Sequence, residues 1–373
     1  MEAQLSERTS EGARAPEVEQ FETVIVGGGQ AGLAIGYHLA NRGRSFVILD
    51  AHERIGDAWR KRWDSLRLFT PAGHDNLPGM GFPAPHWSFP TRDEMAEYLE
   101  TYATEFDLPV RSGVRVDSLA EEGGRYLLAA GDRRFEADQV VIATGPFQAP
   151  KVPAFAPELD PRIVQMHSSE YRNPSQLPDG GVLVVGPGNS GADIALDVAG
   201  THRTWLSGEH PGHIPLNTTG TSGRLAFPLI WFVWTHVLNV GTPVGRKARP
   251  KVLAGPEPLI RVKPKHLAAA GVERVARTSG VKEGLPELED GTVMDVASVI
   301  WATGYRRELG WIDLDGFDAD IEPDTDRGVI EGQPGVYLLG REFLYAFNSH
   351  TIGGVGRDAE HIAERIAARV SDG

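Results

Sequence analysis

The stretch VIVGGGQAG at residues 24–32 decides the fold, because an apolar strand runs directly into a glycine-rich turn and a helix. The Gly-x-Gly-x-x-Gly spacing falls on Gly27, Gly29 and Gly32. In such a unit the first glycine allows the tight turn, the second lets the backbone approach a pyrophosphate, and the third lets helix and strand pack closely. The N–H groups that open the helix complete a site for an anion.

The residues after this turn continue a βαβ unit. We expect a helix over 31–42 that stops at Gly43 and a strand over 45–49 that ends at Asp50. A carboxylate at that strand end accepts hydrogen bonds from ribose hydroxyls and repels a 2′-phosphate. The unit is therefore predicted to bind FAD or NAD, and not NADP.

The pattern occurs a second time, 159 residues further along the chain. Gly186, Gly188 and Gly191 repeat the glycine turn, and the run VVIATG at 140–145 returns as VIWATG at 299–304. Repeated elements in the same order predict two similar α/β units. The second unit should hold a helix over 192–199 and a strand over 204–206. We take Asp193 and Asp197 on that helix as solvated.

Two dinucleotide sites in one chain imply two nucleotides, and electron transfer from NADH or NADPH to FAD is the natural pairing. We predict two Rossmann-like domains, with the NAD(P)-binding domain inserted in the FAD-binding domain. The expected boundaries are a disordered tail at 1–18, an FAD-binding domain at 19–150 and 305–373, and an NAD(P)-binding domain at 151–304. A C-terminal helix over 351–370 should pack back on the first unit.

Composition excludes several classes of function. The 373 residues carry a formal net charge of −14, which makes nucleic acid a poor partner. With no Cys, disulfides, thiolate metal sites and a redox-active Cys pair are all ruled out. No signal peptide is visible, and the most apolar stretch, 225–240, is shorter than the ~20 residues that a membrane span needs. We predict a cytoplasmic protein.

The chain resembles the flavin-containing monooxygenases, including plant YUCCA-like enzymes and bacterial CzcO-like proteins. The residues that carry the resemblance are the acid-to-Trp stretch DAHERIGDAW at 50–59, Ala143-Thr144-Gly145, the linker fingerprint HSSEYRNP at 167–174 and the late motif WATGY at 301–305. The resemblance implies FAD contacts at Gly27, Gly29, Gln30, Ala31, Gly32, Asp50, Ala51, Asp57, Trp59, Val116, Ala143, Thr144, Gly145 and Thr351. It implies NAD(P)H contacts at Gly186, Gly188, Asn189, Ser190, Gly191, Ser207, Glu209 and Thr303.

The chain departs from the family pattern in the linker and near the flavin. Pro161 and Ile163 replace an aromatic residue and a glycine of the linker fingerprint, and Tyr171 replaces Trp, which favours the branch that oxygenates nitrogen and sulfur. Phe69 stands where the family carries an Asn near the oxygen-reacting face of the flavin. The oxygenation mechanism that depends on this Asn therefore cannot be carried over.

The choice of coenzyme stays open. The family's NADPH-preferring members place an Arg after the Ser that ends the second strand, whereas here Ser207 is followed by Gly208 and Glu209. A carboxylate facing a 2′-phosphate is unfavourable, which favours NADH. Arg203 or His210 could compensate, and family habit favours NADPH.

Several other histidines, acidic residues and apolar residues have both a functional and a structural interpretation. His350, with Asn348 nearby, precedes the C-terminal helix, whose start faces the flavin in this family; capping by Ser349 or Thr351 is equally plausible. His210 and His213 lie beside Glu209 without a third well-placed ligand, so no metal is expected. Glu287, Glu289 and Asp290 read as a solvated loop. Trp231, Phe232, Trp234 and Val237 form an apolar face, best explained by core packing or a homodimer surface; a substrate lid or shallow membrane contact is the alternative.

The resulting hypothesis is an NAD(P)H- and FAD-dependent monooxygenase. As the resemblance implies, it transfers one oxygen atom from O₂ through a C4a-hydroperoxyflavin to a small amine, sulfide or carbonyl compound. No protein acid or base can be assigned; His350, Asn348 and Phe69 are the catalytic candidates. The alternatives are an NAD(P)H oxidase that releases peroxide and a flavoprotein redox sensor or accessory factor of ion transport.

Overall fold

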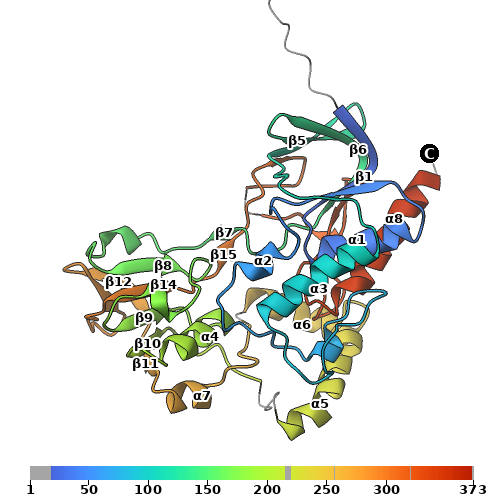
Figure 1. Cartoon of the computed structure of the whole chain (residues 1–373). Coiled ribbons are helices and arrows are strands. Elements are labelled where there is room, and N and C mark those ends of the chain that lie inside the picture. Colours follow the sequence, from blue (N-terminus) through green and yellow to red (C-terminus); the bar gives the residue numbers. More distant parts are fainter. Residues whose placement is uncertain (1–17, 215–219, 256, 320, 372–373) are drawn as a thin grey trace, which may run out of the picture.

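The computed structural model describes residues 18–214, 220–255, 257–319 and 321–371, which form two sheets joined by two crossings of the chain (Figure 1). The expected tail at 1–18 lies outside these residues, apart from Val18. The first sheet has ten strands and a parallel centre in the order β3-β2-β1-β6-β19. Its strands are β1 (Val18–Val26), β2 (Phe46–Leu49), β3 (Val110–Arg111), β4 (Ser118–Glu122), β5 (Arg125–Ala130), β6 (Arg133–Ile142), β16 (Ile312–Asp313), β17 (Thr325–Asp326), β18 (Val329–Ile330) and β19 (Val336–Leu338).

The second sheet is entirely parallel, in the order β11-β10-β9-β14-β8. It consists of β8 (Val164–His167), β9 (Val182–Val185), β10 (Thr204–Ser207), β11 (Glu273–Val275) and β14 (Ser298–Trp301), and a separate hairpin joins β12 (Thr278–Lys282) to β13 (Leu285–Leu288). All five strands come between β6 and β19 in the chain, so the second unit interrupts the first, as predicted. The two connections, β7 (Ala149–Pro150) and β15 (Tyr305–Arg306), pair with each other where the chain crosses between the sheets (Figure 1).

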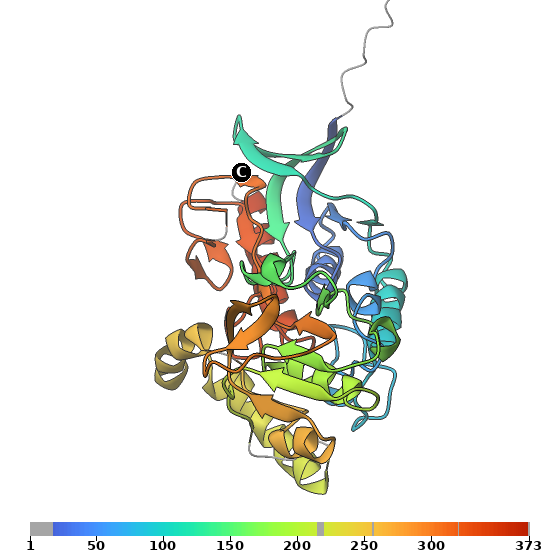
Figure 2. The same ribbon diagram turned by 90° about the vertical axis from the view of Figure 1, so that its left-hand side faces the viewer.

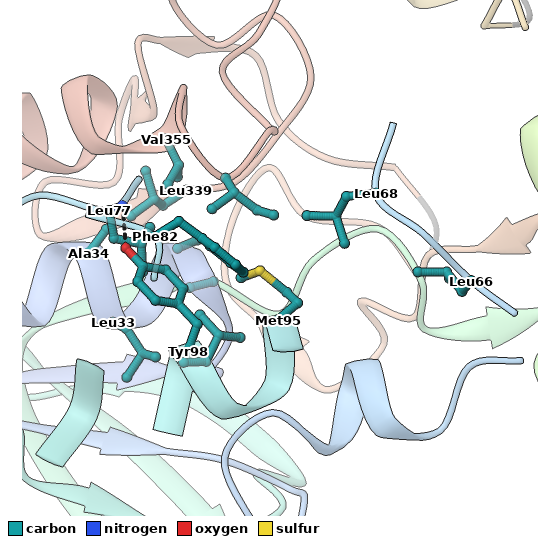
Figure 3. Packing of buried hydrophobic residues seen from close by; sticks show 14 of the residues in the cluster. Leu33, Ala34, Leu66, Leu68, Leu77, Phe82, Met95, Tyr98, Leu339 and Val355 are labelled. Atoms are coloured by element: carbon teal, nitrogen blue, oxygen red, sulfur yellow. Dashed lines mark hydrogen bonds between the residues drawn. The ribbon is translucent and has the colours of Figure 1, made fainter. Parts of the chain in front are cut away.

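Three helices cover one face of the first sheet: α1 (Gln30–Ala40), α3 (Arg92–Glu105) and α8 (Val355–Ser371). The segment 66–82 packs between α3 and the start of α8. Figure 3 shows Leu68 and Met95 in this layer, and there the Tyr98 hydroxyl accepts a hydrogen bond from the Leu77 amide at 2.7 Å. Each apolar side chain buried in this way contributes roughly 1.5–3 kcal/mol. The layer therefore fixes the segment that the sequence places near the flavin.

The remaining helices are α4 (Asn189–Val198), α5 (Thr221–Phe232), a π-helical turn at Val233–Val237, α6 (Pro243–Ala254) and α7 (Pro264–Ala269); α2 (Asp57–Arg60) is a short helix of the first unit, and 3₁₀ turns occupy Ala72–His74, Ala156–Glu158 and Pro174–Gln176. Helices α4 and α7 lie in the second unit, whereas the segment from α5 to α6 contacts residues of the first unit, and Figure 2 shows the chain from a second side. Within the described part of the chain, no helix is long and apolar enough to cross a membrane.

Three local predictions need correction. The C-terminal helix begins at Val355 and not at residue 351, because the chain first makes a compact turn in which a Cβ on Gly354 would lie 1.8 Å from the Asn348 carbonyl oxygen. Asp193 is not solvated: it is half-buried and pairs with Arg261 at 2.8 Å. Asp197 accepts a hydrogen bond from the Tyr171 hydroxyl at 2.8 Å. Sequence alone could not show these partners, because both come from outside the helix.

The predictions of a solvated loop at 287–290 and of an apolar face at 231–237 are only partly confirmed. Glu287 lies in strand β13, while Glu289 and Asp290 are exposed. On the apolar face, Trp234 is buried and packs on Phe347, with ring centroids 5.1 Å apart, which confirms core packing for that residue. Phe232 is 53% exposed, so the face is not uniformly part of the core.

Candidate active site

The two glycine turns are built in the same way. Gly27 has φ +112°, and a Cβ there would lie 2.5 Å from the carbonyl oxygen of Ala143. Gly186 has φ +107°, and a Cβ there would lie 2.3 Å from the carbonyl oxygen of Ala302. Only glycine tolerates this φ together with such a close approach. Each turn is thus packed against the Ala-Thr-Gly motif of its own unit, which explains why both motifs recur with one offset.

The third glycine of each turn lets the helix start close to the turn. A Cβ on Gly32 would lie 1.9 Å from the Gly27 oxygen, and a Cβ on Gly191 would lie 1.8 Å from the Gly186 oxygen. The second glycine differs, because a Cβ on Gly29 or Gly188 would meet no heavy atom within 4 Å. These two positions also have ordinary negative φ, −77° and −69°. Glycine is not needed there by the protein itself, which fits a backbone that a phosphate must approach closely.

Asp50 lies at the end of β2, beside the first turn. Its side chain is buried, and it accepts hydrogen bonds from the Gly28 amide at 2.6 Å and from the His52 amide at 2.7 Å. Burial alone would raise the pKa of Asp50, but the hydrogen bonds from His52 and Gly28 outweigh it and lower the pKa. The carboxylate therefore stays ionised at the strand end where a ribose is expected.

The other predicted FAD residues lie around the same edge. Gln30 and Ala31 open α1, Thr144 and Gly145 follow β6, and Asp57 and Trp59 lie in α2. Val116 is half-buried against the core of the first sheet, and Ala51 is exposed. The sequence missed Arg60, which pairs with Asp57 at 3.2 Å and Glu100 at 2.9 Å and so ties α2 to α3. Its only sequence signal was an arginine three residues after an aspartate.

In the second unit, side chains of the predicted coenzyme residues are already partnered. The Asn189 carboxamide bonds the Ile260 amide at 3.1 Å and the Pro258 carbonyl at 3.3 Å. The Ser207 hydroxyl is buried, donates to the Ala276 carbonyl and accepts from the Thr278 amide, both at 2.9 Å. Thr303 donates to the Lys151 carbonyl, and Ser190 is half-buried on the first turn of α4. At these positions the backbone, and not the side chains, would contact a coenzyme.

A cluster of side chains that the sequence did not predict holds the two units together near the linkers. The Arg62 guanidinium donates to the Tyr305 hydroxyl at 2.9 Å and lies over the Phe147 ring. His167, from the linker fingerprint, contacts the Gly304 carbonyl through Nε2 at 3.0 Å and the Tyr305 ring edge-on. Burial lowers the pKa of His167, so the ring is neutral at pH 7. The fingerprint thus positions the second Ala-Thr-Gly motif.

The three catalytic candidates lie in different environments. Asn348 is buried, and its amide donates to the Thr235 hydroxyl at 3.0 Å. Phe69 is half-buried in the segment below α8. His350 contacts Glu257 of the second unit at 3.4 Å, and Glu342 brings its carboxylate within 4.8 Å of both. Thr351 bonds the Asn348 carbonyl at 2.8 Å, so it stabilises the turn before α8.

The residues around the α8 start are mostly aromatic. A Cβ on Gly353, in that turn, would lie 2.0 Å from the His74 oxygen and 3.3 Å from the Trp231 ring. The His74 ring lies 5.0 Å from the rings of both Phe227 and Trp231. Burial, and secondarily His86, lowers the pKa of His74 to about 4. The His74 ring in this aromatic group is therefore uncharged at pH 7.

Asp75 is a buried acid that the sequence did not single out. It is fully buried, accepts a hydrogen bond from the Thr70 hydroxyl at 2.5 Å, and leaves Oδ2 without a partner among the described residues. Burial raises the pKa of Asp75 to about 8. At pH 7 this carboxyl is mostly protonated.

Comparison with known proteins agrees with this architecture. Residues 24–207 match the family described as pyridine nucleotide-disulphide oxidoreductase. An uncharacterized CzcO-like oxidoreductase of Geobacillus kaustophilus is 38% identical over 92% of this chain and 98% of its own length. The rice indole-3-pyruvate monooxygenase YUCCA4 is 30% identical over 94% of this chain and 88% of its own.

A solved structure supports the same relationship. The flavin-containing monooxygenase of Stenotrophomonas maltophilia has a TM-score of 0.77 and 29% identity, covering 94% of this chain and 99% of that one. The disulfide chemistry in the matching family's name does not extend to this chain, which has no Cys. With the motifs, the fold and near full-length relatives in agreement, the chain belongs to the flavin-containing monooxygenase superfamily of FAD- and NAD(P)H-dependent enzymes.

Proposed function

We propose that FAD binds at the first glycine turn, that NADH or NADPH binds at the second, and that the protein oxygenates a small organic molecule. The observation that carries this proposal is the pair of identically built turns whose second glycines, Gly29 and Gly188, have no protein atom within reach of a Cβ. We take residues 19–150 and 305–373 as the FAD-binding domain and 151–304 as the NAD(P)-binding domain.

The protein's contribution to the reaction is binding and positioning. The helix starts of α1 and α4 offer N–H groups to the two pyrophosphates, and the ionised Asp50 holds a ribose through its free lone pairs. FAD held there would supply the redox chemistry, namely acceptance of a hydride from the coenzyme and activation of O₂. The contacts of Arg62 and His167 with the Tyr305 region hold the two units in register for hydride transfer.

The proposed substrate is a small, uncharged molecule: an amine in its neutral form or a sulfide, which would react as a nucleophile, or a carbonyl compound, which would react as an electrophile. The support is the uncharged aromatic surface of His74, Phe227 and Trp231 at the start of α8. Such a surface favours apolar molecules and excludes water, which protects an oxygenating site. A cytoplasmic location and assembly into a homodimer stay predictions.

Phe69 supports a second candidate function, that of an NAD(P)H oxidase. An aromatic ring where the family has an Asn removes a hydrogen-bonding group near the flavin, and an NAD(P)H oxidase that releases peroxide would follow. The deciding experiment measures peroxide formed per NAD(P)H consumed by the FAD-loaded protein, with and without a panel of amines, sulfides and ketones. Monooxygenation predicts that a substrate lowers the peroxide yield and appears as an oxygenated product. Peroxide close to one per NAD(P)H with every compound would favour the oxidase.

A further inference from the structure

The adenosine end of the coenzyme site lies at the carboxyl end of β10. Gly208, which follows this strand, has φ +122°, and a Cβ there would lie 2.7 Å from the Pro187 ring of the second glycine turn. The residues after β10 therefore lie against the turn that we assign to the coenzyme. A ribose that follows the pyrophosphate would reach this strand end first.

Neither the Ser207 hydroxyl nor Arg203 can read a 2′-phosphate here. Ser207 is buried and bonded to Ala276 and Thr278. Arg203 precedes β10, so it lies at the opposite end of the strand, where it pairs with Glu273 at 3.0 Å and covers the Trp205 ring. The expectation that Arg203 could compensate is therefore wrong. A large side chain at residue 208 is also excluded by Pro187.

Arg274 supplies the positive charge from the neighbouring strand. It lies opposite Leu206 in the parallel pairing of β10 with β11, and its Nη2 donates to the Gly208 carbonyl at 2.6 Å. The contact uses one nitrogen of the guanidinium, and the other two have no hydrogen-bond partner among the described residues. The guanidinium therefore lies beside the ribose position with donors to spare for a phosphate.

The two other groups at this strand end do not compete with Arg274 for that role. Burial, with Arg274 and His213 nearby, lowers the pKa of His210, so this ring is neutral at pH 7. Glu209 is exposed and forms no ion pair within the described part of the chain. Arg274 is exposed as well, but its guanidinium is held by the hydrogen bond to the Gly208 carbonyl, whereas the Glu209 carboxylate can turn into solvent.

We propose that Arg274 reads the 2′-phosphate of the coenzyme, so that the protein prefers NADPH over NADH. This inference rests on the proposed assignment of the second glycine turn to the coenzyme. It names a residue outside the motifs that predict the nucleotide sites, because Arg274 follows β10 by almost 70 residues in the chain and reaches the site only through sheet pairing.

The test uses the FAD-loaded protein and its variant Arg274→Met, which keeps most of the apolar stem. Arg203→Met is the matched control, because it removes an arginine from the other end of the same strand pair. Binding of adenosine 2′,5′-bisphosphate and of 5′-AMP is measured by calorimetry, and flavin reduction is timed with NADPH and NADH.

The wild type should bind the bisphosphate at least about tenfold more tightly than 5′-AMP and favour NADPH similarly. Arg274→Met should remove that preference, with NADH and 5′-AMP changed less than about twofold, and Arg274→Lys should restore part of it. Arg203→Met should behave as the wild type.

Equal use of both coenzymes by the wild type, or an Arg274→Met variant that keeps the NADPH preference, would overturn the proposed role of Arg274. Either result would leave the assignment of the second glycine turn to the coenzyme intact. An equal loss with both coenzymes would show a structural role and would also overturn the proposed role of Arg274. If neither adenosine nucleotide binds and neither coenzyme reduces the flavin, the assignment of the second turn fails, and the inference fails with it.

Discussion

Gly29→Ala should remove FAD without harming the fold. The position has φ −77°, which alanine adopts freely, and the new methyl would have no protein heavy atom within 4 Å. Gly29 is the N-cap of α1, where alanine in place of glycine costs roughly 0.5–1 kcal/mol, while the loss of unfolded-state entropy stabilises by roughly 0.4–1 kcal/mol. The apo-protein should therefore unfold within about 1 kcal/mol of the wild type.

The effect on FAD should be much larger. A methyl between the backbone and the pyrophosphate displaces the phosphates and breaks one or two N–H hydrogen bonds to a charged group, each worth about 1.5–3 kcal/mol. The dissociation constant for FAD should rise roughly tenfold to a thousandfold. Gly188→Ala, at the equivalent open position of the second turn, should weaken binding of the coenzyme and leave FAD bound.

The assay titrates FAD into the deflavinated protein by calorimetry and follows thermal unfolding of the apo-protein. Gly27→Ala is the contrasting variant, because its positive φ and the 2.5 Å approach to the Ala143 oxygen predict a damaged apo-protein. Wild-type FAD affinity in Gly29→Ala would refute the assignment of the first turn. Loss of FAD from Gly188→Ala, with hydride transfer intact, would mean that the two sites are reversed.

Three further predictions concern buried and exposed charges. The folded-state pKa of Asp75, about 8, lies above its ordinary value of 3.8, so its stabilising contribution is complete below pH 4 and is lost as the pH rises to 8. At pH 8 the free energy of unfolding of Asp75→Asn should therefore exceed that of the wild type by roughly 1–3 kcal/mol, and this gain should vanish near pH 4; thermal unfolding at both pH values measures it. Glu322→Gln leaves the buried Arg341 without its carboxylate and should cost roughly 3–5 kcal/mol in urea unfolding, much of it recovered in the double variant with Arg341→Met. Glu209→Arg adds a second guanidinium near that of Arg274 and should raise the NADPH/NADH ratio of kcat/KM roughly tenfold, measured by flavin reduction; an unchanged ratio would show that a side chain at residue 209 does not reach the 2′-phosphate.

The sequence predicts the parts of the fold in which a local pattern and a physical constraint coincide. The glycine turns are recognisable because only glycine fits at Gly27 and Gly32, and the three or four strand residues directly before each turn are apolar because they are buried. The insertion of one unit in the other also follows from the order of the motifs. Each of these features is set by residues close together in the chain.

The parts that were missed depend on contacts between distant residues. Asp193 reads as a surface acid on its helix, and only the fold brings Arg261 against it. Arg203 stands close to the predicted ribose site in sequence, yet it lies at the wrong end of β10, whereas Arg274 arrives from a neighbouring strand. The protonated state of Asp75 depends on burial, which a polar residue among turn-forming neighbours does not predict.

The comparison of the two units suggests how one architecture can select two nucleotides. The turns, the helix starts and the Ala-Thr-Gly contacts are the same in both, so they cannot distinguish FAD from the coenzyme. The units differ one strand further on: β2 ends in an ionised carboxylate held by Gly28 and His52, whereas β10 ends in a glycine whose carbonyl holds Arg274. A negative charge at the first ribose and a positive charge at the second would reject and attract a 2′-phosphate respectively. We therefore expect selectivity to reside in these two strand ends, and exchange of their charges should alter the choice of nucleotide while the glycine turns keep their affinity for pyrophosphate.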